Sequence, residues 1–174
     1  MNTSVLILFR TIHVFAGALW IGAAIVYLFF IKPSVQAIGP AAPQFMQSLT
    51  QRRRYPVFMA SVSLLTVLAG VVLYFYTSGG FNPNWFGTGP GLGYTIGSLA
   101  ALGAFLVGSF GIGPISGKLG SLAQGIGASS RGPTPEQVAR IQSLEKQLAV
   151  AERIDFVLLM ISIVTMATAR YWVL

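Results

Sequence analysis

The one histidine of the chain lies inside its first apolar segment, among other residue types that can bind a cofactor. Arg10, His13, Gly17 and Trp20 are spaced so that they share one face of a helix. An ionisable residue inside a membrane segment is by default a functional candidate. An imidazole can ligate iron, an arginine can pair with a haem propionate, and a glycine leaves room for a flat macrocycle whose edge a tryptophan can contact. These residue types favour a b-type haem between helices.

Further candidates come from the last apolar segment, which we expect to run in the opposite direction. Met166 and Arg170 then lie about as far from the outer membrane surface as His13 and Arg10 do. This match predicts His13 and Met166 as an axial pair, with an arginine on each side. Each of these residues can also have a purely structural role. A membrane histidine can donate a hydrogen bond to a neighbouring carbonyl, a methionine can fill a gap, and arginines can extend to the outer headgroups.

A short internal repeat links the two halves of the chain. The tripeptide Ile-Lys-Pro at 31–33 corresponds to Ile-Gly-Pro at 112–114, an offset of 81 residues (112 − 31). Arg54, before the second apolar segment, similarly corresponds to Arg153, before the fourth. We therefore interpret the chain as two helical hairpins.

The repeat adds further residues near the histidine. The offset of 81 (94 − 13) puts Tyr94 opposite His13, as another candidate for cofactor contact. On the second apolar segment, Thr66 and Gly70 occupy a position that can face His13.

Composition places the chain among integral membrane proteins. Hydrophobic residues make up 54% and charged residues 9% of its 174 residues, with a mean hydropathy of +0.72, whereas soluble domains are about 25% charged. Four apolar blocks of about membrane-spanning length lie at 5–31, 57–76, 92–112 and 154–174. They lack the alternation of barrel strands. We expect one all-α domain, 1–174, a four-helix transmembrane bundle. Because the chain has no cysteine, disulfides, thiolate metal sites and thiol catalysis are excluded.

Basic residues predict the orientation of the helices. Nine of the eleven Lys and Arg residues lie in the loops 32–56 and 113–153, and the loop 77–91 has no charge. By the positive-inside rule, both charged loops are cytoplasmic and both termini lie outside. The net charge of +7 then indicates contact with anionic lipid headgroups, not with nucleic acid. We expect a multi-pass protein of a bacterial inner membrane.

The two cytoplasmic loops carry helix signals of their own. Residues 134–137, Thr-Pro-Glu-Gln, form a helix start with a capping box, and the apolar spacing through Leu148 predicts a rod of about 40 residues that continues into the fourth span. Before it, 120–133 is rich in Gly and Ser and predicts a flexible linker. All four acids lie between Glu136 and Asp155, which we interpret as a solvated helix face. In the first loop, 44–54 is compatible with a helix that kinks at Pro56.

Two motifs resemble a known family. Residues 12–22, Ile-His-Val-Phe-Ala-Gly-Ala-Leu-Trp-Ile-Gly, resemble the histidine-to-tryptophan-glycine first helix of the copper-resistance D-like membrane proteins. Arg-Arg-Tyr at 53–55 and Thr-Val-Leu-Ala-Gly at 66–70 are similar to that family's second helix. The first helix is also similar to that of the four-helix protoporphyrinogen oxidases, whose further histidine and arginine-proline features are missing here. The resemblance covers the first 75 residues and implies haem or copper binding at His13.

These observations favour a small membrane redox or metal-handling protein, active in electron transfer. It would hold haem b, or alternatively copper, through His13 and Met166 in the outer half of the bundle. The alternative is a non-catalytic structural or accessory subunit of a larger membrane complex, or a homo-oligomer, whose cytoplasmic rod 135–153 docks a partner. A small-solute permease ranks last, because the spans carry few polar groups. No nucleophile–base pair, phosphate loop or paired carboxylate indicates hydrolysis or group transfer, and enzymatic activity stays an open question.

Overall fold

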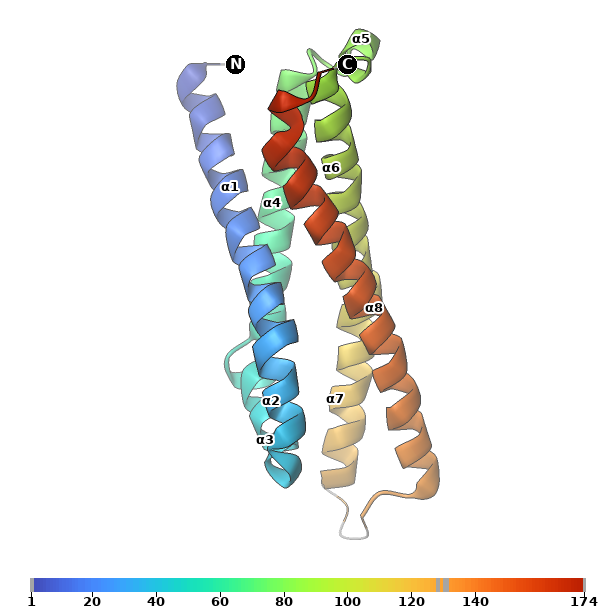
Figure 1. Ribbon diagram of the computed structural model, residues 1–174. Coiled ribbons are helices and arrows are strands. Elements are labelled where there is room, and N and C mark those ends of the chain that lie inside the picture. Colours follow the sequence, from blue (N-terminus) through green and yellow to red (C-terminus); the bar gives the residue numbers. More distant parts are fainter. Residues whose placement is uncertain (1, 128, 130–131, 174) are drawn as a thin grey trace.

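The computed structural model describes residues 2–127, 129 and 132–173, and within these ranges the chain is helical without strands (Figure 1). The first half consists of α1 (Thr3–Val26), the π-helical turn η1 (Tyr27–Ile31), α2 (Lys32–Ala37), the 3₁₀ turn η2 (Gly39–Ala41), α3 (Ala42–Gln47), the π-helical turn η3 (Ser48–Arg52) and α4 (Tyr55–Thr77). The side chain of Asn2 caps α1 by accepting a hydrogen bond from the backbone N–H of Ser4. α1, η1 and α2 form one continuous helix that extends past the predicted end at residue 31.

The second half of the chain consists of α5 (Pro83–Phe86), α6 (Gly89–Leu106), the π-helical turn η4 (Val107–Ile112), α7 (Gly113–Gly127), α8 (Pro135–Thr168) and the 3₁₀ turn η5 (Ala169–Tyr171). The predicted capping box is confirmed, because Thr134 and Gln137 exchange side-chain and backbone hydrogen bonds at the start of α8. The predicted rod is also confirmed as a helix of 34 residues that runs without interruption to Thr168.

Two predictions about the connecting segments are wrong. The segment 120–127 is not a flexible linker, since α7 continues to Gly127 and packs along α8. A helical glycine costs only about 1 kcal/mol relative to alanine, which packing against a neighbour can offset. The helix before Pro56 does not kink there, because the chain breaks at Arg54, whose φ is +52°. Pro56 therefore lies in the first turn of α4, where its missing N–H has no intrahelical partner to lose.

The internal repeat coincides with a shared backbone feature. In η1 the N–H of Lys32 bonds to the carbonyl of Tyr27, and in η4 the N–H of Gly113 bonds to the carbonyl of Gly108. Both pairs are separated by the offset of 81 residues (113 − 32 and 108 − 27), and in both a proline follows directly. Arg54 and Arg153, matched in the sequence by their places before the second and fourth apolar segments, differ in local structure: the chain breaks at Arg54, whereas Arg153 lies inside the uninterrupted α8.

The helices pack mainly as two pairs. α1 lies along α4, and α6 lies along α8, while α4 contacts α6 and α1 contacts α8 over shorter stretches. In Figure 1, α8 crosses in front of α6, and the two chain ends lie at the same end of the molecule. All four long helices contribute to one buried cluster: Trp20, Ala24, Val62, Ala104 and Leu159. Small residues such as Ala104, which is fully buried, let the backbones approach closely.

Three helices within the described residues are long and apolar enough to cross a membrane: Thr3–Ala37, Tyr55–Thr77 and Gly89–Gly127. Large apolar side chains such as Phe15, Leu99 and Phe110 are exposed on them, as suits a lipid environment. α8 is not among the three. Its apolar part begins after Asp155 and ends at Thr168.

Candidate functional site

His13 connects α1 to α4. Its Nδ1 lies 2.8 Å from the carbonyl oxygen of Thr66, and because a carbonyl only accepts, Nδ1 is the protonated donor. In the neutral ring, Nε2 is then the nitrogen with a free lone pair. The sequence prediction that Thr66 and Gly70 face the histidine is confirmed.

Gly70 makes room for the imidazole ring. A Cβ at this position would lie 2.9 Å from Cε1 and 3.0 Å from Nδ1 of His13, closer than carbon atoms normally approach. Gly17 is different, since a Cβ there would meet Thr66 Cγ2 at an ordinary 3.5 Å. Gly17 thus lies in the contact between α1 and α4. The residue that the ring requires is Gly70.

Gly70→Ala is therefore expected to displace the ring of His13 and break its bond to Thr66. Overpacking of this kind costs about 1–3 kcal/mol, measurable as lower thermal stability in detergent. Gly22→Ala is the matched control, because nothing lies within 4 Å of its added Cβ. Since His13 is the one histidine, ¹⁵N-histidine NMR should show Nδ1 protonated in the wild type. A wild-type ring protonated only at Nε2 would contradict this geometry.

Two further predicted residues are engaged in helix packing. Trp20 is only 5% exposed and belongs to the buried cluster with Val62 and Leu159. Met166 packs against α6, where a Cβ on Gly97 would come within 2.6 Å of its Cγ. Its sulfur accepts a hydrogen bond from Ser162 Oγ at 3.8 Å. His13 thus contacts α4, while Met166 contacts α6.

The remaining candidates lie in the first half of α1, near the start of α6 and in η5, towards the end of the molecule at which both chain ends lie in Figure 1. Arg10 is exposed. Arg170 is exposed as well, stacks over the ring of Tyr171 at 4.6 Å from its centroid and donates a hydrogen bond to the hydroxyl of that residue. Tyr94 stacks on Trp85, with ring centroids 6.4 Å apart and planes 6° from parallel. None of these described contacts joins the three residues to His13.

A cluster that sequence reasoning missed lies at the opposite end of the spans. Glu152 and Asp155 are 5% and 7% exposed, so the interpretation of all four acids as a solvated face is wrong for these two. It holds for Glu136 and Glu145, which are exposed. Lys32 of α2 donates to Glu152 of α8 and forms an ion pair with it. Glu152 and Asp155 lie one helical turn apart on α8. The sequence analysis did not recognise these two acids as a buried pair.

Two tyrosines border this ion pair. Tyr27 of η1 and Tyr55 of α4 stack with centroids 5.7 Å apart, and the Tyr27 hydroxyl lies within electrostatic range of Glu152. Tyr55 donates a hydrogen bond to the carbonyl of Ala23 at 3.1 Å. A signal for this cluster was present in the sequence. The buried positions of α8 continue the apolar stripe at helical spacing: Leu144, Glu152, Asp155, Leu159 and Ser162.

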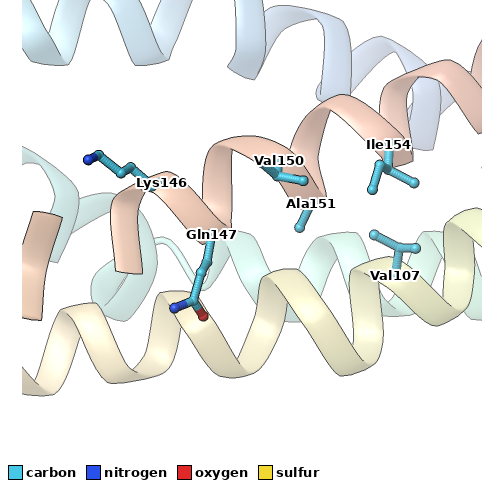
Figure 2. A pocket seen from close by; sticks show the side chains of 6 residues that line it. All are labelled: Val107, Lys146, Gln147, Val150, Ala151 and Ile154. Atoms are coloured by element: carbon cyan, nitrogen blue, oxygen red, sulfur yellow. The ribbon is translucent and has the colours of Figure 1, made fainter. Parts of the chain in front are cut away.

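A shallow groove of about 420 Å³ runs between η4 and α8. Figure 2 shows Val107 facing the side of α8 that carries Val150, Ala151 and Ile154, with Lys146 and Gln147 further along that helix. Because its lining is apolar apart from Lys146 and Gln147, which bring no second titratable group with them, the groove offers no chemistry of its own.

Within the described residues, no three His, Cys, Asp or Glu side chains gather as a metal site would require. Comparison with family models, with curated proteins and with solved structures finds no match for the chain. What the structure defines is a class: a helical protein with three helices able to span a membrane, a histidine bonded between α1 and α4, and a buried acid–lysine pair.

Proposed function

We propose that this chain is a small integral membrane redox or metal-handling protein that binds haem b through Nε2 of His13. The supporting observation is the bond from Nδ1 of His13 to the Thr66 carbonyl. A ligating histidine usually donates its other ring N–H to a carbonyl or carboxylate, which fixes the ring and makes it a better ligand. The resemblance of the first helix to the copper-resistance D-like proteins points to the same residue.

The residues present suit haem better than copper. Haem needs only one or two axial ligands from the protein, and His13 fits as one of them. A copper site would need several ligands, and His13 has no second histidine or cysteine beside it. Arg10 lies one turn nearer the chain start and is exposed, as a propionate partner should be. When bound, the haem would supply one-electron chemistry, while His13 and Arg10 would hold and orient it.

The proposal includes a fourth span and an orientation. The apolar end of α8 would complete a four-helix bundle of two hairpins, with both termini outside and the basic extensions α2, α3 and α7 in the cytoplasm. Support comes from the uncharged 77–91 segment and from the two chain ends lying at the same end of the molecule in Figure 1. A bacterial inner membrane would be its location.

Haem binding is tested by the absorption spectrum of the detergent-purified protein, oxidised and then reduced, with metal analysis. We expect a Soret band that His13→Ala abolishes and that Thr11→Ala, an exposed change on the same helix, leaves intact. Met166→Leu preserves volume, so it should alter the spectrum only if the thioether is the second ligand. Wild-type protein without haem or copper, and a His13→Ala variant equally stable and active in cells, would refute the proposal.

Orientation is tested by single cysteines in the naturally cysteine-free chain. Position 84 lies in the uncharged segment and position 124 in α7, and both native side chains are exposed. An impermeant thiol reagent added to intact cells should label Asn84→Cys and spare Gln124→Cys. Labelling of position 124 alone would mean that the chain has the opposite orientation.

A second candidate is an accessory subunit of a larger membrane complex. The observation that favours it is the engagement of Trp20 and Met166 in helix packing, which gives these residues a role without a cofactor. In that case His13→Ala would change stability or assembly, and no preparation of the native protein would carry haem.

A further inference from the structure

Asp155 is a buried acid with an unsatisfied oxygen. The residue is 7% exposed, and its Oδ1 is shielded from solvent without any hydrogen-bond partner. A buried ionised carboxylate without a partner is one of the most costly groups in a protein. Something must neutralise it.

The groups around Asp155 do not supply that neutralisation. On its own helix the facing group is Glu152, which is negative and already paired with Lys32. Tyr27 of η1 lies near Glu152 and stacks on Tyr55 of α4, and both tyrosines carry neutral hydroxyls. η4 carries no titratable residue, and the other charged neighbours in sequence and fold, Arg153 and Lys118, are exposed.

The ligand that fits this position is a proton. A metal ion would need several oxygen ligands, but the ammonium group of Lys32 already occupies Glu152, and no third acid joins the two. A proton needs only the Asp155 carboxylate itself. Its binding converts the carboxylate to a neutral acid that can donate the hydrogen bond the site lacks.

We propose that Asp155 is a proton-binding site of this protein, separate from the site at His13. The proton comes from the water on the side of the basic extensions, where the Lys32 side chain is 29% exposed. One proton and one carboxylate combine into one carboxylic acid, and the net charge of the Lys32, Glu152 and Asp155 side chains changes from −1 to 0.

The test uses the fact that Asp155 is the one aspartate in the chain. The full-length protein is labelled with [4-¹³C]aspartate and placed in lipid vesicles, and infrared difference spectra are recorded between mildly acidic and alkaline pH. We expect a protonated carboxyl band at neutral pH that shifts with the isotope and is replaced by a carboxylate band as the pH rises. Asp155→Asn should lack this band, and Glu145→Gln, at an exposed acid, should retain it.

The labelled wild type decides the question even if Asp155→Asn fails to fold. An isotope-sensitive signal that stays that of a carboxylate at every pH where the protein is folded would overturn the proposal. An unchanged band in Asp155→Asn would overturn it too. Neither outcome depends on haem, so failure here is distinguishable from failure of the function proposed for His13.

Discussion

Lys32→Met is expected to lower the free energy of unfolding by about 3 kcal/mol, the lower end of the range for breaking a buried ion pair. The loss is large because Glu152, only 5% exposed, would remain buried without its cation. It stays at the lower end because the Lys32 side chain is 29% exposed, so water screens part of the attraction. Thermal or chemical unfolding in detergent measures the change.

Two variants show whether the pair itself is responsible. Lys118→Met removes an exposed lysine and should change stability little. The double change Lys32→Met with Glu152→Leu should recover most of the loss, because apolar residues of similar size can replace a buried pair at little cost. A double variant as unstable as Lys32→Met alone would show that the pair is not the source of the effect.

Gly93→Ala is expected to destabilise the protein by about 3 kcal/mol or more, the upper range for overpacking. An added Cβ would lie 2.8 Å from Cβ and 2.9 Å from Cα of Ala169. Ala169 has no flexible end that can move away, so α6 and η5 must separate. Circular dichroism on heating and the yield of monodisperse protein both report the loss.

Gly108→Ala, further along the same continuous helix, is the matched control. Nothing lies within 4 Å of a Cβ there, and alanine favours a helix over glycine by about 1 kcal/mol. Its stability should stay level or rise. Equal stability of Gly93→Ala and Gly108→Ala would mean that α6 and η5 do not pack as closely as described.

Local signals predicted much of the fold. The capping box and the apolar stripe predicted α8, because a cap formed by four consecutive residues can be recognised from the local sequence alone. The break at Arg54 was missed because nothing in its side chain demands a positive φ. The continuation of α7 through its glycines was missed because glycine was read as a helix breaker, although α7 also contacts α8.

For the candidate sites as well, some residue positions were predicted from the sequence and others were not. The prediction that Thr66 and Gly70 of the second apolar segment face His13 is confirmed. Depth matching predicted a partner for His13 in Met166, but equal depth does not specify which neighbouring helix a side chain faces, and Met166 packs on α6. Whether either residue binds a cofactor stays a prediction. Burial of Glu152 and Asp155 was missed because charge was given more weight than their place on the apolar stripe.

Two of the three π-helical turns in the described residues, η1 and η4, lie inside long continuous helices, where they are candidate bending points. In η1 and η4 the hydrogen bonds span five residues, and the proline two residues after each turn has no N–H to reinforce the backbone. Sharp kinks in helices occur mostly at prolines and at π-helical turns of this kind. A displacement of α2 relative to α1 would therefore be expected to bend the helix at 27–31, and a displacement of α7 relative to α6 would bend it at 107–112.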